Sequence, residues 1–238
     1  MAAPRTAKLI AKQRLTENVH ELTFEMIDPA ELGYDSGKYI IVATDVLKEN
    51  GTPVKRAYSI ASPPEDQGMF KLCFKLIPGG VATNFLVNLH AGDEIRFSGP
   101  WGKNFHLPAE IDPVQSFCFV GSGTALSAVH GHLWRLARDS SWRGRARFYW
   151  GLRRKADLYH AEAVAALAGD SRFRVEILYS DEPGGKMLDR AFEEGACEIE
   201  PRALHYLAGN GNMIESVTQT LSAHGVDVDR IFKEIYFS

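Results

Sequence analysis

Residues 56–63 read Arg-Ala-Tyr-Ser-Ile-Ala-Ser-Pro, and this stretch decides how we interpret the chain. It mixes polar, aromatic and apolar residues ahead of Ser62-Pro63, which is typical of a β-strand that ends in a turn. Because a strand turns successive side chains to opposite faces, we expect Arg56 and Tyr58 on one face and Ser59 on the other. An arginine fork grips phosphate, a tyrosine ring packs on a flat ring system, and a serine hydroxyl both donates and accepts. By itself, such a stretch is more often the edge of a barrel strand than a ligand site.

The first hundred residues around this stretch predict six strands and one helix. The expected strands are Lys8–Leu15, Val19–Met26, Lys38–Val46, Lys55–Ser62, Met69–Ile77 and Glu94–Ser98, and the helix is Val81–Leu89. Turn residues such as Asp28-Pro29, Asn50-Gly51 and Pro78-Gly79-Gly80 separate them. This number of short strands with one helix favours a small closed antiparallel β-barrel.

The stretch Leu107–Gln115 contains two prolines and is predicted to be a linker. After it, predicted strands alternate with predicted helices. Strands are expected at Ser116–Val120, Ala146–Gly151, Phe173–Tyr179, Ala203–Gly209 and Ile231–Tyr236, and helices at Ala125–Arg138, Ala156–Ala168, Met187–Glu194 and Asn212–His224. Alternating strands and helices predict a parallel, doubly wound α/β sheet. We therefore expect a two-domain protein, with the antiparallel β-barrel in residues 1–108 and the α/β domain in residues 109–238.

Composition narrows the class of protein. The chain has 238 residues, 45% of them hydrophobic, and a formal net charge of −3, which is ordinary for a globular protein and argues against nucleic acid as a partner. Its three cysteines are too few to ligate an iron–sulfur cluster, and we expect buried free thiols. No apolar run is long enough to span a membrane, and the start of the chain lacks the apolar core of a signal peptide, so we expect a cytoplasmic protein. His130 and His132 would face different sides of a helix, and we expect no metal site.

Three glycine-rich turns join strands to helices. The first, Gly79-Gly80-Val81-Ala82-Thr83, leaves a free helix N-terminus, which is a physically sound anion site. The second, Gly121-Ser122-Gly123-Thr124-Ala125, has the strand–turn–helix geometry that holds a nucleotide pyrophosphate, although it lacks the third glycine of the full fingerprint and such glycines often serve only the turn. The third turn is Gly209-Asn210-Gly211-Asn212-Met213.

The Arg56-Ala57-Tyr58-Ser59 strand followed by a glycine-rich helix start resembles the flavin domain of ferredoxin–NADP reductase-like proteins. The resemblance runs from about Val19 to the C-terminus, and it implies an FAD-binding barrel followed by an NAD(P)-binding domain. It implies that Arg56 contacts the FAD pyrophosphate, that Tyr58 packs on the flavin, and that Ser59 lies near the reactive flavin nitrogen. It further implies a phosphate site made by the backbone of Gly80, Val81 and Ala82 with the Thr83 side chain.

The same resemblance assigns the second and third turns to the pyridine nucleotide. Gly121, Gly123 and Thr124 match the family's nucleotide loop, and Gly209, Asn210 and Met213 would lie beside the nicotinamide. Relatives carry a Cys-Gly pair in the third turn, whereas this chain has Ala208 in place of the cysteine, so any role of that thiol is absent.

The end of the chain, Glu234-Ile235-Tyr236-Phe237-Ser238, is unusually aromatic. One interpretation is a final strand within the sheet. The resemblance implies that Glu234 relays protons with Ser59 and that Tyr236 shields the flavin, with Phe237 as a rival for the shielding role. A shielding ring has to move aside before nicotinamide can stack.

The choice of nucleotide depends on the ends of two strands in the second domain. Arg153 could supply a basic group for the 2′-phosphate of NADPH, but Ser180 and Asp181 place polar and acidic groups where NADPH-selective relatives have an arginine. A carboxylate repels the 2′-phosphate and accepts hydrogen bonds from ribose hydroxyls, so we expect NADH.

These observations predict an FAD-dependent NAD(P)H oxidoreductase. By resemblance, it passes hydride from nicotinamide to flavin, and electrons on to a carrier such as ferredoxin, flavodoxin or an oxygenase component. One alternative is a free flavin or quinone reductase. Another is an electron-transfer subunit that has no turnover of its own within a larger enzyme.

Overall fold

The computed structural model describes residues 4–237, which separate into two units. One unit contains the chain up to His106 together with His130–His132, and the other contains Leu107–Val129 and the residues from Leu133 onward. In the described chain, no helix or strand lies between Trp101 and Phe117, which agrees with the linker predicted there.

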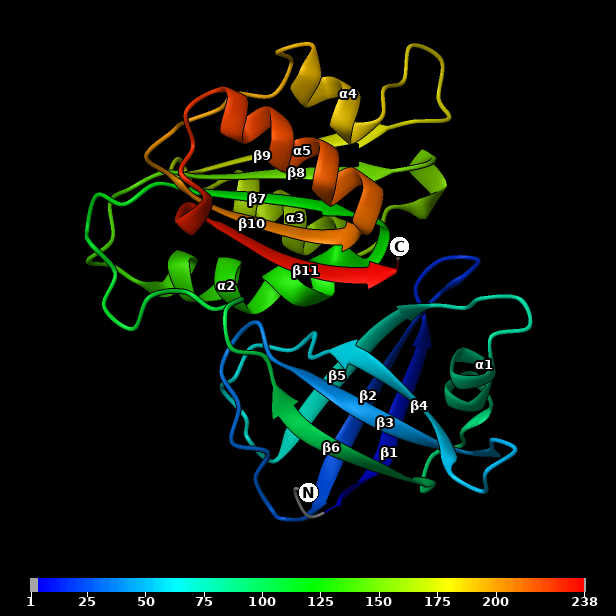
Figure 1. Ribbon diagram of the computed structural model, residues 1–238. Coiled ribbons are helices and arrows are strands. Elements are labelled where there is room, and N and C mark those ends of the chain that lie inside the picture. Colours follow the sequence, from blue (N-terminus) through cyan, green and yellow to red (C-terminus); the bar gives the residue numbers. More distant parts are fainter. Residues whose placement is uncertain (1–3, 238) are drawn as a thin grey trace. The chain divides into compact units, whose positions relative to one another are not determined.

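The first unit contains six strands and one helix (Figure 1). They are β1 (Arg5–Arg14), β2 (Val19–Asp28), β3 (Tyr39–Leu47), β4 (Pro53–Ser59), β5 (Met69–Lys75), α1 (Val81–Asn88) and β6 (Glu94–Trp101). The strands form one antiparallel sheet in the order β4-β3-β6-β1-β2-β5. An antiparallel bridge between Ile60 and Leu72 links its two edge strands, so the predicted barrel is confirmed.

The barrel core follows from the alternation of the strands. Leu22 and Phe24 on β2, and Phe70 and Leu72 on β5, are fully buried, and the rings of Phe24 and Phe70 stack 5.3 Å apart. Because their neighbours along each strand point outward, one face of the sheet closes on an apolar interior. Helix α1 packs against β3 and β4, and it carries the first glycine-rich turn to these strands.

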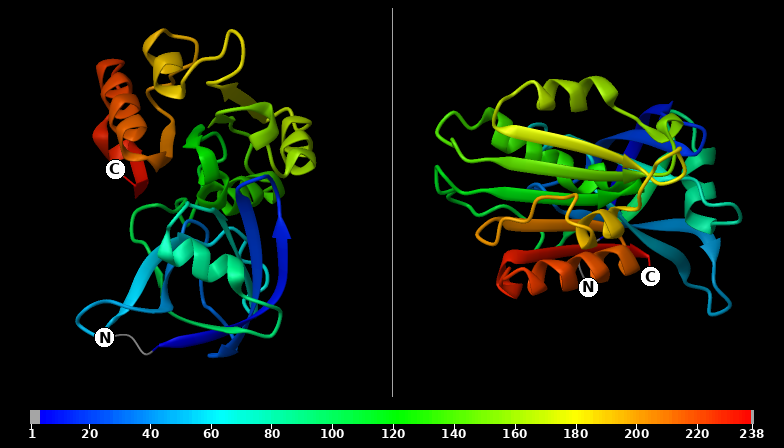
Figure 2. Two further views of the ribbon diagram at one scale, coloured as in Figure 1. Left: turned by 90° about the vertical axis from the view of Figure 1, so that its right-hand side faces the viewer. Right: turned by 90° about the horizontal axis from the view of Figure 1, so that it is seen from above.

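The second unit is a five-stranded parallel sheet with helices on both faces. Its elements are β7 (Phe117–Ser122), α2 (Leu126–Arg138), β8 (Ala146–Leu152), α3 (Ala161–Ala168), β9 (Phe173–Tyr179), α4 (Leu188–Glu193), β10 (Leu204–Asn210), α5 (Gly211–Ala223) and β11 (Ile231–Phe237). The strand order is β11-β10-β7-β8-β9, and every pair is parallel, which confirms the predicted doubly wound sheet. The right-hand view of Figure 2 shows α3 and α5 on opposite sides of this sheet.

The two faces of the parallel sheet have different cores. On the side of α4 and α5, Val120 and Leu207 pack with aliphatic residues of both helices. The opposite face is aromatic, with Tyr206 stacked between Phe119 and Phe232 at ring distances of 5.3 and 4.8 Å. Buried free cysteines are confirmed, because Cys73, Cys118 and Cys197 all lie within the cores.

One predicted helix begins later than expected. Helix α3 starts at Ala161 rather than Ala156, because His160 is left-handed, with φ +51°, and therefore interrupts the helical backbone. The preceding Lys155–Asp157 segment forms a separate 3₁₀ turn, in which the Asp157 carboxylate accepts the N–H of Arg154 at 3.0 Å. Within residues 4–237, no helix is both long and apolar enough to cross a bilayer.

Candidate functional site

Strand β4 presents the Arg56-Ala57-Tyr58-Ser59 stretch on the edge of the barrel sheet. Arg56 pairs with Val42 and Tyr58 pairs with Ile40, so both share a face of the sheet with core residues of β3. Arg56 is exposed, and its Nη1 donates to the carbonyl of Lys55 at 2.8 Å. Its guanidinium therefore keeps donors available for an anion.

Tyr58 is half-buried on this face, and its ring meets the edge of Phe74 with centroids 5.8 Å apart. Burial raises the pKa of Tyr58 to about 12, while the positive charge of Arg56 acts in the opposite direction. The phenol is therefore neutral at physiological pH. Ser59 pairs with Tyr39 and is only 8% exposed, whereas Ala57 is exposed.

The first glycine-rich turn prepares the N-terminus of α1. The N–H of Gly80 donates to the carbonyl of Ile77 at 2.8 Å, and Gly79 has φ +71°, which requires glycine. A Cβ on Gly80 would lie 2.8 Å from the Thr83 hydroxyl, so a side chain there would force a neighbour to shift. Among the described residues no side chain caps α1, and the N–H groups of Val81, Ala82 and Thr83 belong to its first turn, which is suited to an anion.

A pocket of about 470 Å³ lies beside α1 in the same unit. Its lining includes Val81, Asn84 and Asn88 of α1, with Asp45 from β3 and Asp93 from the loop before β6. Two carboxylates make it a poor site for phosphate. Sequence analysis did not predict this pocket, whose lining combines the two carboxylates with Gly79 and Val81 of the glycine-rich turn.

The second turn follows the central strand β7. Gly121 has no room for a side chain, because a Cβ would lie 2.5 Å from Cβ of Ala125. Gly123 has φ +60°, and its carbonyl accepts the indole N–H of Trp150 at 2.9 Å. The next carbonyl, that of Thr124, accepts the hydroxyl of Ser127 at 2.7 Å.

The third turn lies directly beside the second. The N–H of Asn210 donates to the hydroxyl of Ser122 at 3.2 Å. The side chain of Asn210 caps α5 by accepting the N–H groups of Asn212 and Met213 at 2.9 and 3.3 Å. Two of the three glycine turns thus form one surface at the carboxyl ends of parallel strands, where ligands bind in open α/β sheets.

Some predicted residues of these turns are buried. The Met213 side chain belongs to the core on the α4–α5 side, and its backbone N–H takes part in the Asn210 cap. Ala208 is fully buried and pairs with Gly121 in the sheet. The structure therefore brings the backbone of these residues to the turn, and not the Met213 thioether.

The barrel unit matches a family model described as an oxidoreductase FAD-binding domain over residues 6–106. Ferredoxin–NADP reductase B of Sorangium cellulosum is 34% identical over 183 residues, which cover 75% of this chain and 71% of that protein. The chain belongs to the ferredoxin–NADP reductase family. It is an oxidoreductase whose barrel is an FAD-binding domain and whose family uses NAD(P)H.

Several other reductases are similar over part of their length. The reductase subunit of an aromatic O-demethylase from Amycolatopsis is 29% identical over 187 residues, which cover 71% of this chain and 54% of that protein. One component of the Na⁺-translocating NADH-quinone reductase of Colwellia psychrerythraea is 26% identical over 147 residues, which cover 58% of this chain and 47% of that protein. The chain thus spans about half the length of these two relatives.

Solved structures share the two-part fold. The Amycolatopsis cytochrome P450 reductase GcoB superimposes with a TM-score of 0.84 at 25% identity, covering 99% of this chain and 70% of that chain. The cytochrome b5 reductase domain of Ulva prolifera nitrate reductase gives a TM-score of 0.80 at 20% identity, with 98% and 97% coverage.

In this ferredoxin–NADP reductase relative, the ends of β8 and β9 are mixed in charge. Asp181 donates its N–H to the carbonyl of Arg153 at 2.9 Å, and its carboxylate accepts the Ser180 hydroxyl at 2.7 Å. The Arg153 side chain is exposed. Lys186 forms an ion pair with Glu194.

The C-terminal strand β11 pairs with β10, so the interpretation as a final strand is confirmed for the backbone. Glu234 pairs with Ala208. The Tyr236 hydroxyl lies 3.3 Å from Ser127 Oγ, and because that serine donates its single proton to the Thr124 carbonyl, the tyrosine is the donor. The Phe237 side chain lies outside the described residues.

Sequence reasoning missed Trp150, Ser122 and Ser127, which hold the turns in place. Ser122 lies in the second glycine-rich turn, and Trp150 lies in the predicted strand Ala146–Gly151. Their long-range partners, 88 and 27 residues away, carry no local signal.

Proposed function

We propose that the chain is an FAD-dependent NAD(P)H reductase that delivers electrons to a separate carrier or oxygenase component. The observation that carries this proposal is the uncapped start of α1, a helix that contacts strand β4 with its exposed Arg56, in a barrel of the FAD-binding family. The named activities of relatives, a ferredoxin reductase and an O-demethylase reductase subunit, support the choice of acceptor. We assign residues 1–108 to FAD and residues 109–238 to the nucleotide.

The residues of the barrel unit fit FAD. Gly80 lacks the Cβ that would crowd the turn, and the first-turn N–H groups of α1 are oriented for phosphate. Arg56 supplies a guanidinium for the pyrophosphate, Tyr58 a ring for the flavin, and Ser59 a hydroxyl. When bound, FAD supplies a centre that takes two electrons from nicotinamide and releases them singly or together.

The residues of the second unit fit a pyridine nucleotide. The paired turns at Gly121–Thr124 and Gly209–Gly211 supply backbone donors at a helix start, as a pyrophosphate needs. Asp181 accepts hydrogen bonds from ribose hydroxyls and repels a 2′-phosphate, which supports NADH as the donor. Glu234 and Tyr236 are assigned to proton relay and to shielding of the flavin.

A second acceptor class has its own support. The similarity to a component of an NADH-quinone reductase favours a quinone as the alternative acceptor. A further alternative, a subunit without turnover of its own, predicts no oxidation of NAD(P)H by the isolated chain.

The test is an anaerobic absorbance titration of the purified protein with NADH and, separately, with NADPH. We expect a flavin spectrum that NADH bleaches at lower concentration than NADPH does. Steady-state assays with a one-electron carrier and with a quinone then assign the acceptor class. A protein that stays colourless after incubation with FAD would contradict the proposal.

A further inference from the structure

Trp150 occupies a place in the second unit that the assignments above do not use. It lies near the end of β8, pairs with Gly121 across the sheet, and is fully buried. Its indole stacks on Phe148 at 5.8 Å and meets the Tyr159 ring edge-on at 5.0 Å. These rings fix the plane of the indole and therefore the direction of its one N–H donor.

That N–H donates to the carbonyl of Gly123 at 2.9 Å. A peptide group is planar and trans, so its C=O and N–H point in opposite directions. When the Gly123 carbonyl is directed toward the buried indole, the N–H of Thr124 is directed away from it. The Trp150 bond thus bears on the direction of a backbone donor in the second glycine-rich turn.

The Gly123–Thr124 peptide lies in the 3₁₀ turn Gly123–Ala125, which opens α2. Within residues 4–237, a Cβ at Gly123 would meet no atom within 4 Å, so no side chain packs over this side of residue 123. The flanking groups are held separately, because Ser122 accepts the N–H of Asn210 and the Thr124 carbonyl accepts the Ser127 hydroxyl. The Gly123–Thr124 peptide is therefore the part of the turn whose carbonyl is held from β8, by Trp150.

We propose that Trp150 is a positioning residue that directs the N–H of Thr124 toward the pyrophosphate of the bound pyridine nucleotide. This inference rests on the proposed function, since it needs the nucleotide to bind at this turn. Without the indole N–H, the peptide can rotate and the donor is lost to the phosphate. The binding of the adenine and ribose groups does not depend on the Thr124 N–H.

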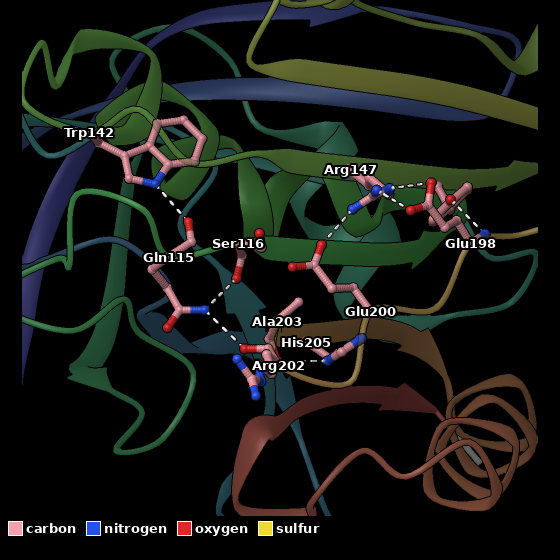
Figure 3. Close-up of polar contacts among 10 residues, drawn as sticks. Gln115, Ser116, Trp142, Arg147, Glu198, Glu200, Arg202, Ala203 and His205 are labelled. Carbon is pink, nitrogen blue, oxygen red and sulfur yellow. Dashed lines mark hydrogen bonds and ion pairs between the residues drawn. The ribbon is translucent and has the colours of Figure 1, made fainter.

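The same unit offers a matched control. Trp142 is equally buried, and its indole N–H donates to the carbonyl of Gln115 at 2.8 Å. Figure 3 shows this bond beside the Arg147 ion pairs with Glu198 and Glu200. It precedes β7, at the amino ends of the strands, whereas the Trp150 bond lies at the carboxyl ends. Replacing either tryptophan by phenylalanine removes one buried indole N–H, but only one of them concerns the nucleotide turn.

The experiment measures the binding of ADP-ribose and of adenosine to the FAD-loaded protein by calorimetry, with adenosine read by competition. ADP-ribose contains the pyrophosphate and adenosine contains no phosphate. We expect Trp150→Phe to weaken ADP-ribose about three- to ten-fold and to leave adenosine unchanged. Trp142→Phe should change neither affinity. If Trp150→Phe does not fold, the benzothiophene analogue of tryptophan, placed at position 150 only, keeps the ring shape and removes the N–H.

The outcomes separate the two proposals. Wild-type protein that does not bind ADP-ribose would contradict nucleotide binding at this unit, and the inference with it. Wild-type binding with no loss in the Trp150 variant would overturn the inference alone. Equal weakening of ADP-ribose and adenosine, or an equal loss in Trp142→Phe, would assign Trp150 to general stability and would also overturn it.

Discussion

The backbone N–H of Asn210 donates to the hydroxyl of Ser122 at 3.2 Å, and this bond joins the turn after β10 to the turn after β7. The two turns approach each other so closely that a Cβ on Gly209 would lie 2.3 Å from Ser122 Oγ. Gly209 also has φ +127°, a backbone conformation that other residues rarely adopt. The shared surface of the two turns therefore depends on a glycine at position 209.

We expect Gly209→Ala to reduce both stability and nucleotide affinity, because the new methyl group must displace Ser122. The control is Gly225→Ala, where φ is also positive, at +82°, but no atom lies within 4 Å of the new Cβ. Gly225→Ala should cost about 1–2 kcal/mol from the backbone alone, and Gly209→Ala at least about 1 kcal/mol more. Urea unfolding and NADH titration measure the two effects. Equal losses in both variants would show that the contact with Ser122 is unimportant.

Arg56→Ala should release FAD, because a pyrophosphate would lose a charged, bidentate donor. We expect affinity for FAD to fall about ten-fold or more. Lys55→Ala is the matched control. Lys55 is exposed, and because it is the neighbour of Arg56 in β4 its side chain points to the opposite face of the strand. Flavin released on gel filtration measures retention. Normal yellow protein from the Arg56 variant would contradict the assignment of β4 to FAD.

Asp181→Arg should shift the nucleotide preference toward NADPH. The substitution replaces a negative charge by a positive one near the expected 2′-phosphate, which we expect to raise the NADPH:NADH ratio of kcat/KM on the order of ten-fold. Asp229→Arg makes the same charge change at an exposed position before β11, near the amino end of that strand. A ratio that is unchanged in the Asp181 variant, or that shifts equally in both, would remove the argument for NADH.

His205 makes the second unit sensitive to acid. This side chain is fully buried, its Nδ1 lies 3.1 Å from the Ala203 carbonyl, and its Nε2 has no hydrogen-bond partner among the described residues. Burial lowers the pKa of His205 from 6.5 to about 4. Between these two values the unfolded chain binds a proton that the folded chain does not, so stability falls as pH drops through this window.

We expect this group to remove about 2 kcal/mol of stability between pH 7.5 and pH 5.0, because the slope approaches about 1.4 kcal/mol per pH unit below the unfolded pKa. Urea unfolding followed by tryptophan fluorescence at pH 7.5 and pH 5.0 measures it. His205→Phe should show a smaller loss between the two pH values than the wild type, whereas His224→Gln, at an exposed position on the end of α5, should not. The difference between pH values cancels any fixed cost of the substitution. An equal loss in wild type and His205→Phe would contradict the prediction.

The fold could be predicted from sequence because its signals are local. Alternation along Val19–Met26 places Leu22 and Phe24 on one face, and that face is the barrel core. The turn at Pro78-Gly79-Gly80 fixes where α1 begins, and the helix ends within one residue of the predicted Leu89. Strand period and turn chemistry act over a few residues, so they can be read from one sequence.

The supports of the candidate site could not be predicted in this way. The bonds from Trp150 to Gly123 and from Asn210 to Ser122 join different elements, and no local pattern says which donor meets which carbonyl or hydroxyl. The predicted start of α3 was wrong for a related reason. Residues Lys155–Asp157 have helical propensity, but Tyr159 packs against Trp150 and the left-handed His160 interrupts the helix. Tertiary packing overrides propensity there.

The strand order β11-β10-β7-β8-β9 also bears on how the protein is made on the ribosome. All six barrel strands lie between Arg5 and Trp101, so this unit can fold as soon as its residues emerge. The central strand β7 is synthesised early in the second unit, yet it gains its second neighbour only when β10 appears about 80 residues later. Until then the Ser122 hydroxyl lacks its Asn210 donor. The surface shared by the second and third glycine-rich turns is therefore completed late in translation, after the barrel has been able to acquire its cofactor.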